Sequence, residues 1–291
     1  MTNRHITKEI FRDPVLERTS PADLSVIFYI GLNNLRVAFR QKSENKFISL
    51  ARYHSDRIEG LPESETLSLL FRELTSDIPV IKSAEDKKAI LETGFYTLVP
   101  AGLFNKNSGS TYLNFNYKIP AGLHVLTNTI QNNEIINVFG VDKKYLDLIN
   151  RLAGFPEILH QCTVFSESHL VRYQRKNEEG RVFLSIRYQY LDILYLKNDT
   201  VQYLNSFECR SNEDFAYFVL FALEQLGLNP ETIEAGLSGE VDENETVFNI
   251  LSKFIRNIEI ISPYNGFSYS EQIDPLELQR NYLLFNAGLC G

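Results

Sequence analysis

Few residue patterns in this chain are typical of catalysis or metal binding. His160, Cys162 and His169 lie close enough in the sequence to be considered as metal ligands, but His and Cys that alternate along a strand are more often packing residues. Asp192 and Asp199 fall in expected hairpin turns, where Asp side chains bond to nearby backbone groups without any catalytic role. The sequence contains no G-x-x-x-x-G-K-[ST], H-E-x-x-H or G-x-S-x-G motif. We therefore predict no metal site, no cofactor and no catalytic residue.

The feature that organises the chain is a strand pattern that occurs twice. Residues 23–53 contain three short strands, divided at residues 32–34 and by the polar run 41–45, and residues 181–209 repeat the same strands and breaks. This self-similarity predicts a duplicated α/β unit. A shift of about 156 positions superimposes the copies and pairs Tyr29 with Ser185, Gly31 with Arg187, Leu35 with Leu191 and Val37 with Ile193.

The composition excludes several classes of protein. The 291 residues suit two lobes of about 150 residues each, and 44% of the residues are hydrophobic. A net charge of -8 argues against binding to nucleic acid or to an anionic membrane surface, because both require clustered Lys and Arg. The three cysteines are too far apart for a disulfide framework. No apolar segment resembles a signal peptide or a membrane span, so we expect a cytoplasmic, unanchored protein.

The remaining elements are expected to alternate between strands and helices, which calls for mixed sheets covered by helices. We predict a loosely packed arm at residues 1–22, a first lobe at 23–176 and a second lobe at 177–291, with the last helix returning to the first lobe. A strand is expected at residues 158–165. Helices are expected, from apolar spacing and capping residues, at about residues 63–75, 142–153, 166–176, 211–227, 243–256 and 275–289.

The two strand-hairpin-strand-strand-helix units resemble the actin-like ATPase fold, a duplicated, ribonuclease H-like architecture shared by actin, sugar kinases and heat-shock chaperone ATPases. The resemblance implies two lobes, each with a mixed five-stranded type of sheet flanked by helices. More narrowly, the chain looks like a bacterial family of unassigned function, known mainly from Bacteroidota. This narrower similarity is carried by the opening strand, the run VPAGLF at residues 99–104, residues 223–241, the run FIRN at residues 254–257 and the closing Leu289-Cys290.

The resemblance also implies where nucleotide would bind, and this sequence departs from the family pattern there. In the fold, the first turn of each half grips phosphate, and the first strand ends in Asp, then any residue, then Gly and Thr or Ser. Here Tyr29 stands at the carboxylate position and Leu32 at the Thr or Ser position, so only Gly31 remains. Without the carboxylates, magnesium would lose its main protein ligands, so we expect catalysis to be absent.

The second half departs from the same pattern. Its corresponding positions are Ser185 and the run from Arg187 to Tyr190, where a glycine-rich turn would be required. Gly236 and Gly239 fall where the adenosine-binding turn of the fold would lie, although two glycines after a strand are more often simple turn residues.

Two hypotheses for function remain. The first is a non-catalytic actin-like scaffold or adaptor, whose interlobe cleft or sheet edges bind a protein partner. The turn formed by Arg187, Tyr188, Gln189 and Tyr190 is a candidate surface, since an exposed Arg flanked by tyrosines is typical of interfaces, although its rings can equally fold onto the sheet. The second is a nucleotide-binding protein, ATPase or kinase of the same superfamily with a degenerate site. It predicts at least two carboxylates in a polar cleft between the halves.

Overall fold

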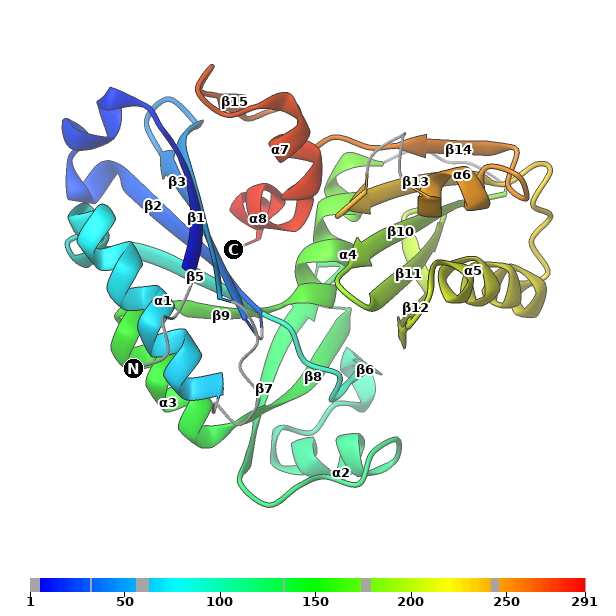
Figure 1. The fold of residues 1–291 in the computed structure, drawn as a ribbon. Coiled ribbons are helices and arrows are strands. Elements are labelled where there is room, and N and C mark those ends of the chain that lie inside the picture. Colours follow the sequence, from blue (N-terminus) through cyan, green and yellow to red (C-terminus); the bar gives the residue numbers. More distant parts are fainter. Residues whose placement is uncertain are drawn as a thin grey trace. The chain divides into compact units, whose positions relative to one another are not determined.

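The computed structural model describes residues 6–31, 33–55, 63–132, 134–173, 179–241 and 246–290. Residue contacts divide the chain into two compact units. Unit 1 comprises residues 1–164 and 266–273, and unit 2 comprises residues 165–265 and 274–291. Each unit contains a mixed sheet flanked by helices (Figure 1), which confirms the predicted α/β class. No helix in these described ranges is long and apolar enough to cross a membrane.

Unit 1 is built on a seven-stranded sheet whose middle strand, β2, is buried along its whole length. A strand that is apolar on both faces belongs in the interior of a sheet. β3 pairs antiparallel with β2 and with β4, while β5 and β9 continue the sheet in parallel on the other side of β2. In spatial order the strands are β1 (Ile6–Arg12), β4 (Lys46–Ser55), β3 (Asn34–Gln41), β2 (Leu24–Ile30), β5 (Asp86–Leu91) and β9 (Glu157–His160), with β15 (Ser268–Tyr269) on β4.

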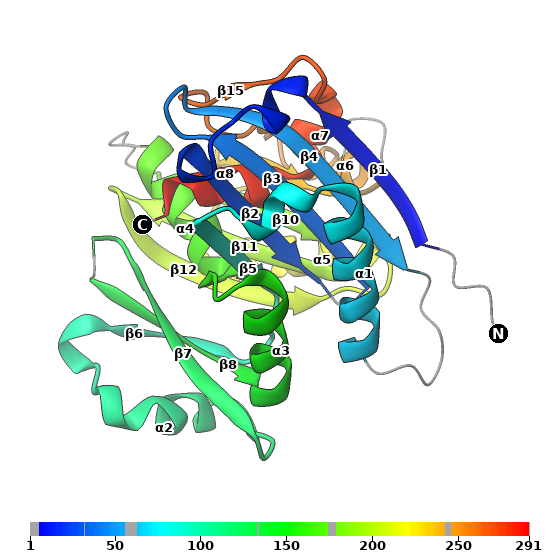
Figure 2. The same ribbon diagram turned by 90° about the vertical axis from the view of Figure 1, so that its left-hand side faces the viewer.

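Two helices, α1 (Glu63–Asp77) and α3 (Lys143–Ala153), lie side by side on one face of this sheet (Figures 1 and 2). α1 buries its leucines and places Phe71 against Phe28 of β2, with ring centroids 5.5 Å apart. α3 begins at the predicted cap, where Asp142 accepts a hydrogen bond from the backbone N–H of Tyr145 at 3.0 Å. It ends at Gly154 in the left-handed conformation.

A small three-stranded antiparallel sheet also belongs to unit 1. Its order is β6 (Tyr96–Pro100), β8 (Ile135–Asp142) and β7 (Leu123–Ile130), and α2 (Gly109–Asn114) packs on it. Val99, Leu113 and Val138 are the buried centre of this subdomain.

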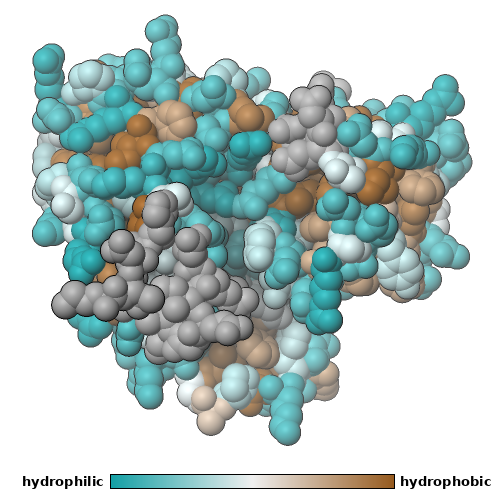
Figure 3. Space-filling view, viewed as in Figure 1, coloured by the Kyte–Doolittle hydropathy of each residue, from teal (hydrophilic) through white to brown (hydrophobic). Residues whose placement is uncertain are grey.

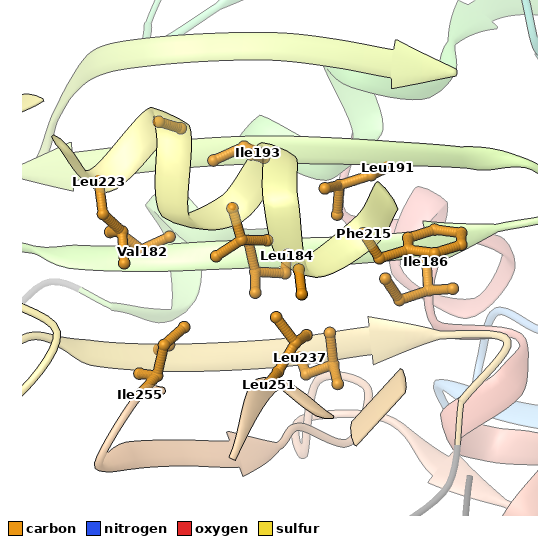
Figure 4. Close-up of a cluster of buried hydrophobic side chains, with 14 of the residues drawn as sticks. Val182, Leu184, Ile186, Leu191, Ile193, Phe215, Leu223, Leu237, Leu251 and Ile255 are labelled. Atoms are coloured by element: carbon orange, nitrogen blue, oxygen red, sulfur yellow. The ribbon is translucent and has the colours of Figure 1, made fainter. Parts of the chain in front are cut away.

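Unit 2 is built on a five-stranded sheet with the spatial order β12 (Thr200–Glu208), β11 (Tyr190–Lys197), β10 (Arg181–Arg187), β13 (Glu234–Gly239) and β14 (Asn257–Ile260). The helices α5 (Asn212–Leu226) and α6 (Thr246–Leu251) pack on this sheet and on each other. Figure 4 shows the core between the sheet and these helices, where Leu184 and Ile193 of the sheet meet Phe215 and Leu223 of α5. The shorter helices α7 (Pro275–Arg280) and α8 (Tyr282–Asn286) contact β13.

The duplication is visible in the strand order of both sheets. The five strands β4-β3-β2-β5-β9 of unit 1 and β12-β11-β10-β13-β14 of unit 2 share the same order and the same parallel and antiparallel pairings. Tyr29 pairs with Arg36 in the first hairpin, and Ser185 pairs with Asp192 in the second. The register also shifts after Phe39 in one sheet and after Tyr195 in the other. These pairs follow the shift that the sequence predicted.

Several local predictions differ from the structure. Within the expected arm, Ile6–Arg12 forms the edge strand β1. Most of its residues are exposed, so its sequence does not alternate between apolar and polar residues. The expected strand at 158–165 stops at His160, after which α4 (Gln161–Arg172) begins and continues from unit 1 into unit 2. The C-terminal helices belong to unit 2, and the segment that returns to unit 1 is the short strand β15.

The described part of the chain also contains six 3-10 helices. They are η1 (Pro14–Glu17), η2 (Pro21–Asp23), η3 (Pro79–Lys82), η4 (Ala101–Leu103), η5 (Lys106–Ser108) and η6 (Ala287–Leu289).

Candidate functional site

The candidate site in unit 1 is the end of β2, where the fold would place a metal-binding carboxylate. Tyr29 fills this position with a buried ring, and its hydroxyl donates a hydrogen bond to the carboxylate of Glu92, just after β5. The guanidinium carbon of Arg36, opposite on β3, lies 5.4 Å from the centre of the Tyr29 ring. The Tyr29 phenol at this strand end therefore contacts both the Glu92 carboxylate and the Arg36 guanidinium.

Further acidic and phenolic groups lie near this cluster. Burial raises the pKa of Tyr145 in α3, and the negative charges of Glu63 and Glu92 raise it further. Tyr145 is therefore a neutral phenol at physiological pH. In the ranges that the structure describes, no three His, Cys, Asp or Glu side chains are grouped so that they could hold a metal ion.

Gly31 is retained in the first turn, but its backbone is used within the hairpin. Its N–H donates to the carbonyl oxygen of Asn34 at 3.0 Å. A Cβ at this position would lie 2.7 Å from the side-chain nitrogen of Asn34, so the Asn34 side chain would have to move to admit another residue. The amide expected to approach a phosphate oxygen is thus engaged inside the protein. Leu32, expected at the Thr or Ser position, lies outside the described residues.

The equivalent turn of unit 2 is closed by an ion pair. Arg187 at the end of β10 donates two hydrogen bonds to Asp192 of β11, with N–O distances of 2.7 Å and 2.8 Å. Both side chains are buried, and the hydroxyl of Ser206 also donates to Asp192. The guanidinium carbon of Arg187 lies 5.3 Å from the centre of the Tyr190 ring.

This geometry corrects two expectations. Arg187 is not exposed, since the ion pair draws it onto the sheet, and Asp192 lies within a strand instead of a turn. Asp199 does lie in the turn between β11 and β12, with a positive φ of 58°. Tyr188 projects from the turn with 66% of its surface exposed, and Gln189 beside it also has a positive φ.

Ser185 and the two glycines of β13 lie in closely packed parts of the unit 2 sheet. Ser185 is fully buried between Asp192 and Ser238 on the neighbouring strands, and its hydroxyl has no hydrogen-bond partner among the described residues. Gly239 has a φ of 96°, and a Cβ there would lie 2.1 Å from the carbonyl oxygen of Ile186. Gly236 lies inside β13, where a Cβ would press on Phe183 and Ile261. Close backbone and side-chain packing accounts for both glycines.

His160 and Cys162 are packing residues in unit 1. The Nδ1 atom of His160 accepts from the backbone N–H of Cys162 at 3.2 Å and lies 3.0 Å from the side-chain nitrogen of Asn137. Its Nε2 atom must then carry the proton, which it donates to the carbonyl of Thr93 at 3.1 Å. Both ring nitrogens are engaged, so His160 offers no lone pair to a metal. Cys162 is fully buried.

His169 lies within an aromatic cluster of unit 2. Its ring stacks on Phe183 with centroids 3.9 Å apart, and its Nδ1 atom lies 3.3 Å from the hydroxyl of Tyr282. Burial lowers the pKa of His169 well below its usual value, and the positive charges of Arg172 and Arg181 lower it further. The imidazole is therefore neutral at physiological pH.

The sequence prediction missed Glu92 and the partnership of Arg187 with Asp192. The sequence did contain a pattern that points to Asp192. The shift that pairs Tyr29 with Ser185 also pairs Arg36 with Asp192, and these two charged residues lie opposite Tyr29 and Ser185 on the neighbouring strands. Charged residues on both hairpins thus stand opposite the positions expected to bind phosphate. Glu92 follows the short strand β5, and no pattern in the sequence indicated that it contacts Tyr29.

The sequence can now be compared with known families. The model of a family described as protein of unknown function, DUF3822, matches residues 15–258. The chain belongs to this family. A comparison with curated proteins finds no match.

Solved structures show the fold that this DUF3822 protein shares. A Bacteroides thetaiotaomicron protein with an actin-like ATPase fold and unknown function is similar with a TM-score of 0.71 and 19% identity, over 90% of this chain and 97% of that one. A chain of the PilM-PilN type IV pilus biogenesis complex is similar with a TM-score of 0.55 and 14% identity, over 93% of this chain and 97% of that one. The DUF3822 chain thus has the actin-like ATPase fold, as its duplicated strands predicted.

Proposed function

We propose that this DUF3822 protein is a non-catalytic actin-like scaffold or adaptor that binds a protein partner in the cytoplasm. One observation carries the proposal. Both strand ends at which the fold would bind phosphate and metal are filled by side chains that bond to each other, Tyr29 with Glu92 and Arg187 with Asp192.

Opening either contact for a ligand would be unfavourable. Separating Arg187 from Asp192 would break a buried ion pair, which costs several kcal/mol, on the order of 3–5. The binding of magnesium-ATP would have to compensate for this loss of free energy, at a turn that offers no glycine and whose nearby carboxylate, Asp192, is bonded to Arg187. The site therefore favours a closed, structural role.

Two further observations agree with protein binding. The similar PilM chain is found in a complex with PilN, so the fold is compatible with a protein-binding role. The net charge of -8 disfavours nucleic acid and anionic membranes as partners. On the hairpin turn, Tyr188 and Gln189 are the exposed residues that a partner would contact, whereas Arg187 supports the turn from inside.

Isothermal titration with magnesium-ATP tests the loss of nucleotide binding. We expect no heat of binding up to millimolar nucleotide and no release of phosphate. Micromolar binding together with measurable hydrolysis would overturn the proposal. Magnesium-ADP serves as a second ligand, because a site that binds only the product would also contradict it.

Retained features favour nucleotide binding as the second candidate. Gly31 is still present, and Glu92 supplies a carboxylate next to the expected metal position. Under this alternative the contact between Tyr29 and Glu92 is a resting state that nucleotide opens. Tyr29→Phe would then remove the hydroxyl that is bonded to Glu92 and strengthen the binding of magnesium-ATP, whereas the adaptor proposal expects no binding by either form.

A further inference from the structure

We propose that the outward face of α5 in unit 2 binds a helical segment of a protein partner in which apolar side chains lie between two basic residues. The proposal rests on the adaptor function and adds the surface and the chemistry of the partner. It depends on the aromatic ridge, which we define as Tyr217 and Phe221 on α5. The two residues are four apart, so they lie one above the other on the same face of the helix.

The aromatic ridge is exposed and has a rigid base. Tyr217 and Phe221 are 62% and 43% exposed, and their rings stack with centroids 6.2 Å apart. Tyr217 also contacts the edge of Phe218, with ring centroids 5.2 Å apart, and Phe218 stacks on Phe207 of β12 with centroids 4.6 Å apart. Phe207 and Phe218 pack against the buried core. Aromatic anchors that are held in place before binding are the residues that dominate protein interfaces.

Folding does not require aromatic residues at these two positions. The inner face of α5 already buries Phe215, Ala216, Val219, Ala222 and Leu223 against the sheet. The outer face of such a helix usually carries polar residues. Figure 3 shows hydrophobic residues among hydrophilic ones over the part of the surface where α5 and α6 lie. Two large rings together on the outer face are the kind of patch that marks an interaction site.

The charges around the aromatic ridge specify the partner. Glu213 lies four residues before Tyr217 and Glu224 lies three residues after Phe221, so both exposed carboxylates share the face of the ridge. α5 carries no basic residue, and the exposed Arg210 before it is paired with Glu208 at 3.3 Å. Asp214 is engaged in the N-terminal capping box. The ridge is therefore bounded by negative charge at both ends.

A helix matches this arrangement in length and periodicity. Glu213 and Glu224 are eleven residues apart, which corresponds to about 16 Å along a helix. Two Lys or Arg residues eleven apart on a partner helix would span the same distance and share one face, because eleven residues make about three turns. Apolar side chains between them would lie on Tyr217 and Phe221, as in the packing of two amphipathic helices.

A pull-down from the native cell tests the surface. Wild-type protein and the variant Tyr217→Ser/Phe221→Ser are compared with Phe115→Ser, which replaces another exposed phenylalanine in unit 1. We expect the ridge variant to lose the captured partner and the Phe115 variant to keep it, with thermal melts showing that all three are folded. Retention by the ridge variant would overturn the surface assignment. Failure of the wild-type protein to capture any partner would instead overturn the adaptor function.

Designed peptides test the chemistry of the partner directly. One helical peptide carries leucines on one face between two lysines eleven residues apart, and the second has glutamates in place of the lysines. We expect the lysine peptide to bind roughly ten-fold more tightly in fluorescence anisotropy, because two exposed ion pairs replace two repulsions. Glu213→Lys/Glu224→Lys should reverse this preference, and Glu85→Lys in unit 1 should preserve it. Equal binding of the two peptides would overturn the proposal.

Discussion

Arg187 and Asp192 face each other across the first hairpin of unit 2 and form a buried, two-bonded ion pair, with N–O distances of 2.7 Å and 2.8 Å. The pair lies at the turn that the resemblance to the actin-like fold marks as the expected phosphate-binding position. It links the two strands of this hairpin, and its contribution can be measured as the free energy of unfolding.

Asp192→Asn should destabilise the protein by about 3–5 kcal/mol, because it removes the buried carboxylate that neutralises the Arg187 charge. Urea unfolding monitored by circular dichroism measures this loss. The double variant Arg187→Met/Asp192→Leu removes both charges and should recover most of the lost stability. Arg210→Ala is the matched surface control, since its exposed ion pair with Glu208 contributes about 0–1 kcal/mol. If Asp192→Asn behaves like the surface control, the pair does not stabilise the hairpin.

Tyr29→Phe should lower the free energy of unfolding by about 1–2 kcal/mol, because the Glu92 carboxylate loses the hydroxyl that donates to it. The ring remains, so packing within the sheet is preserved. Tyr188→Phe removes the hydroxyl of an exposed tyrosine and should leave stability unchanged in the same urea experiment. Equal effects of the two substitutions would show that the contact with Glu92 is not stabilising.

The residues explain which parts of the fold were predictable. The first strand of each copy is buried, and the breaks between the strands are marked by turn residues, so the sequence located the duplication and its shift. Strand β1 was missed because Lys8 and Glu9 are exposed on a sheet edge, where no apolar pattern is needed. The segment Ser268–Tyr269 is too short to have any periodicity. Apolar faces of the C-terminal helices indicate burial but do not say against which sheet.

The candidate site was harder to predict than the fold. The absence of phosphate-binding residues could be predicted from the sequence, because that prediction needs only the residue types at Tyr29 and Ser185. What replaced them could not, since the contact between Tyr29 and Glu92 joins two strands whose parallel pairing is set by the sheet. The burial of Arg187 was not predicted either, because residue types alone do not show which side chains meet across strands. Its burial depends on the register that brings Asp192 beside it.

His169 should make unit 2 sensitive to acid. Its pKa is lowered in the folded protein and lies near 6.5 when unfolded, so its contribution to stability is complete above about pH 6.5 and decreases as the pH falls below that value. The decrease is at most about 1.4 kcal/mol per pH unit for one proton. Urea unfolding between pH 7.5 and pH 5 compares wild type with His169→Phe, which retains an aromatic ring against Phe183. The variant should show a smaller loss at low pH, and equal pH dependence would contradict this origin.

Cys209 should be unreactive in the folded protein. Burial, together with the nearby carboxylates of Asp214 and Glu208, raises the pKa of its thiol to about 12, so almost no thiolate is present at pH 8. Cys162 and Cys290 are buried as well. We expect iodoacetamide to label none of the three until urea unfolds the protein, with mass spectrometry of peptides identifying each site. Labelling of Cys209 at a low urea concentration would show that β12 and α5 separate before global unfolding.

Gly239→Ala should destabilise the end of β13 more than any other glycine substitution at a helix or strand end in unit 2. Its φ is 96°, and the added Cβ would lie 2.1 Å from the carbonyl oxygen of Ile186, so the β10–β13 pairing must move. Strain and lost pairing together should cost about 2–4 kcal/mol.

Gly227→Ala is the matched control, because Gly227 has a φ of 67° with no atom within 4 Å of its Cβ position. Only the backbone strain of about 1 kcal/mol remains there. Equal losses for the two variants in urea unfolding would show that the close approach to Ile186 relaxes freely, and the difference between them measures what that contact contributes to the sheet.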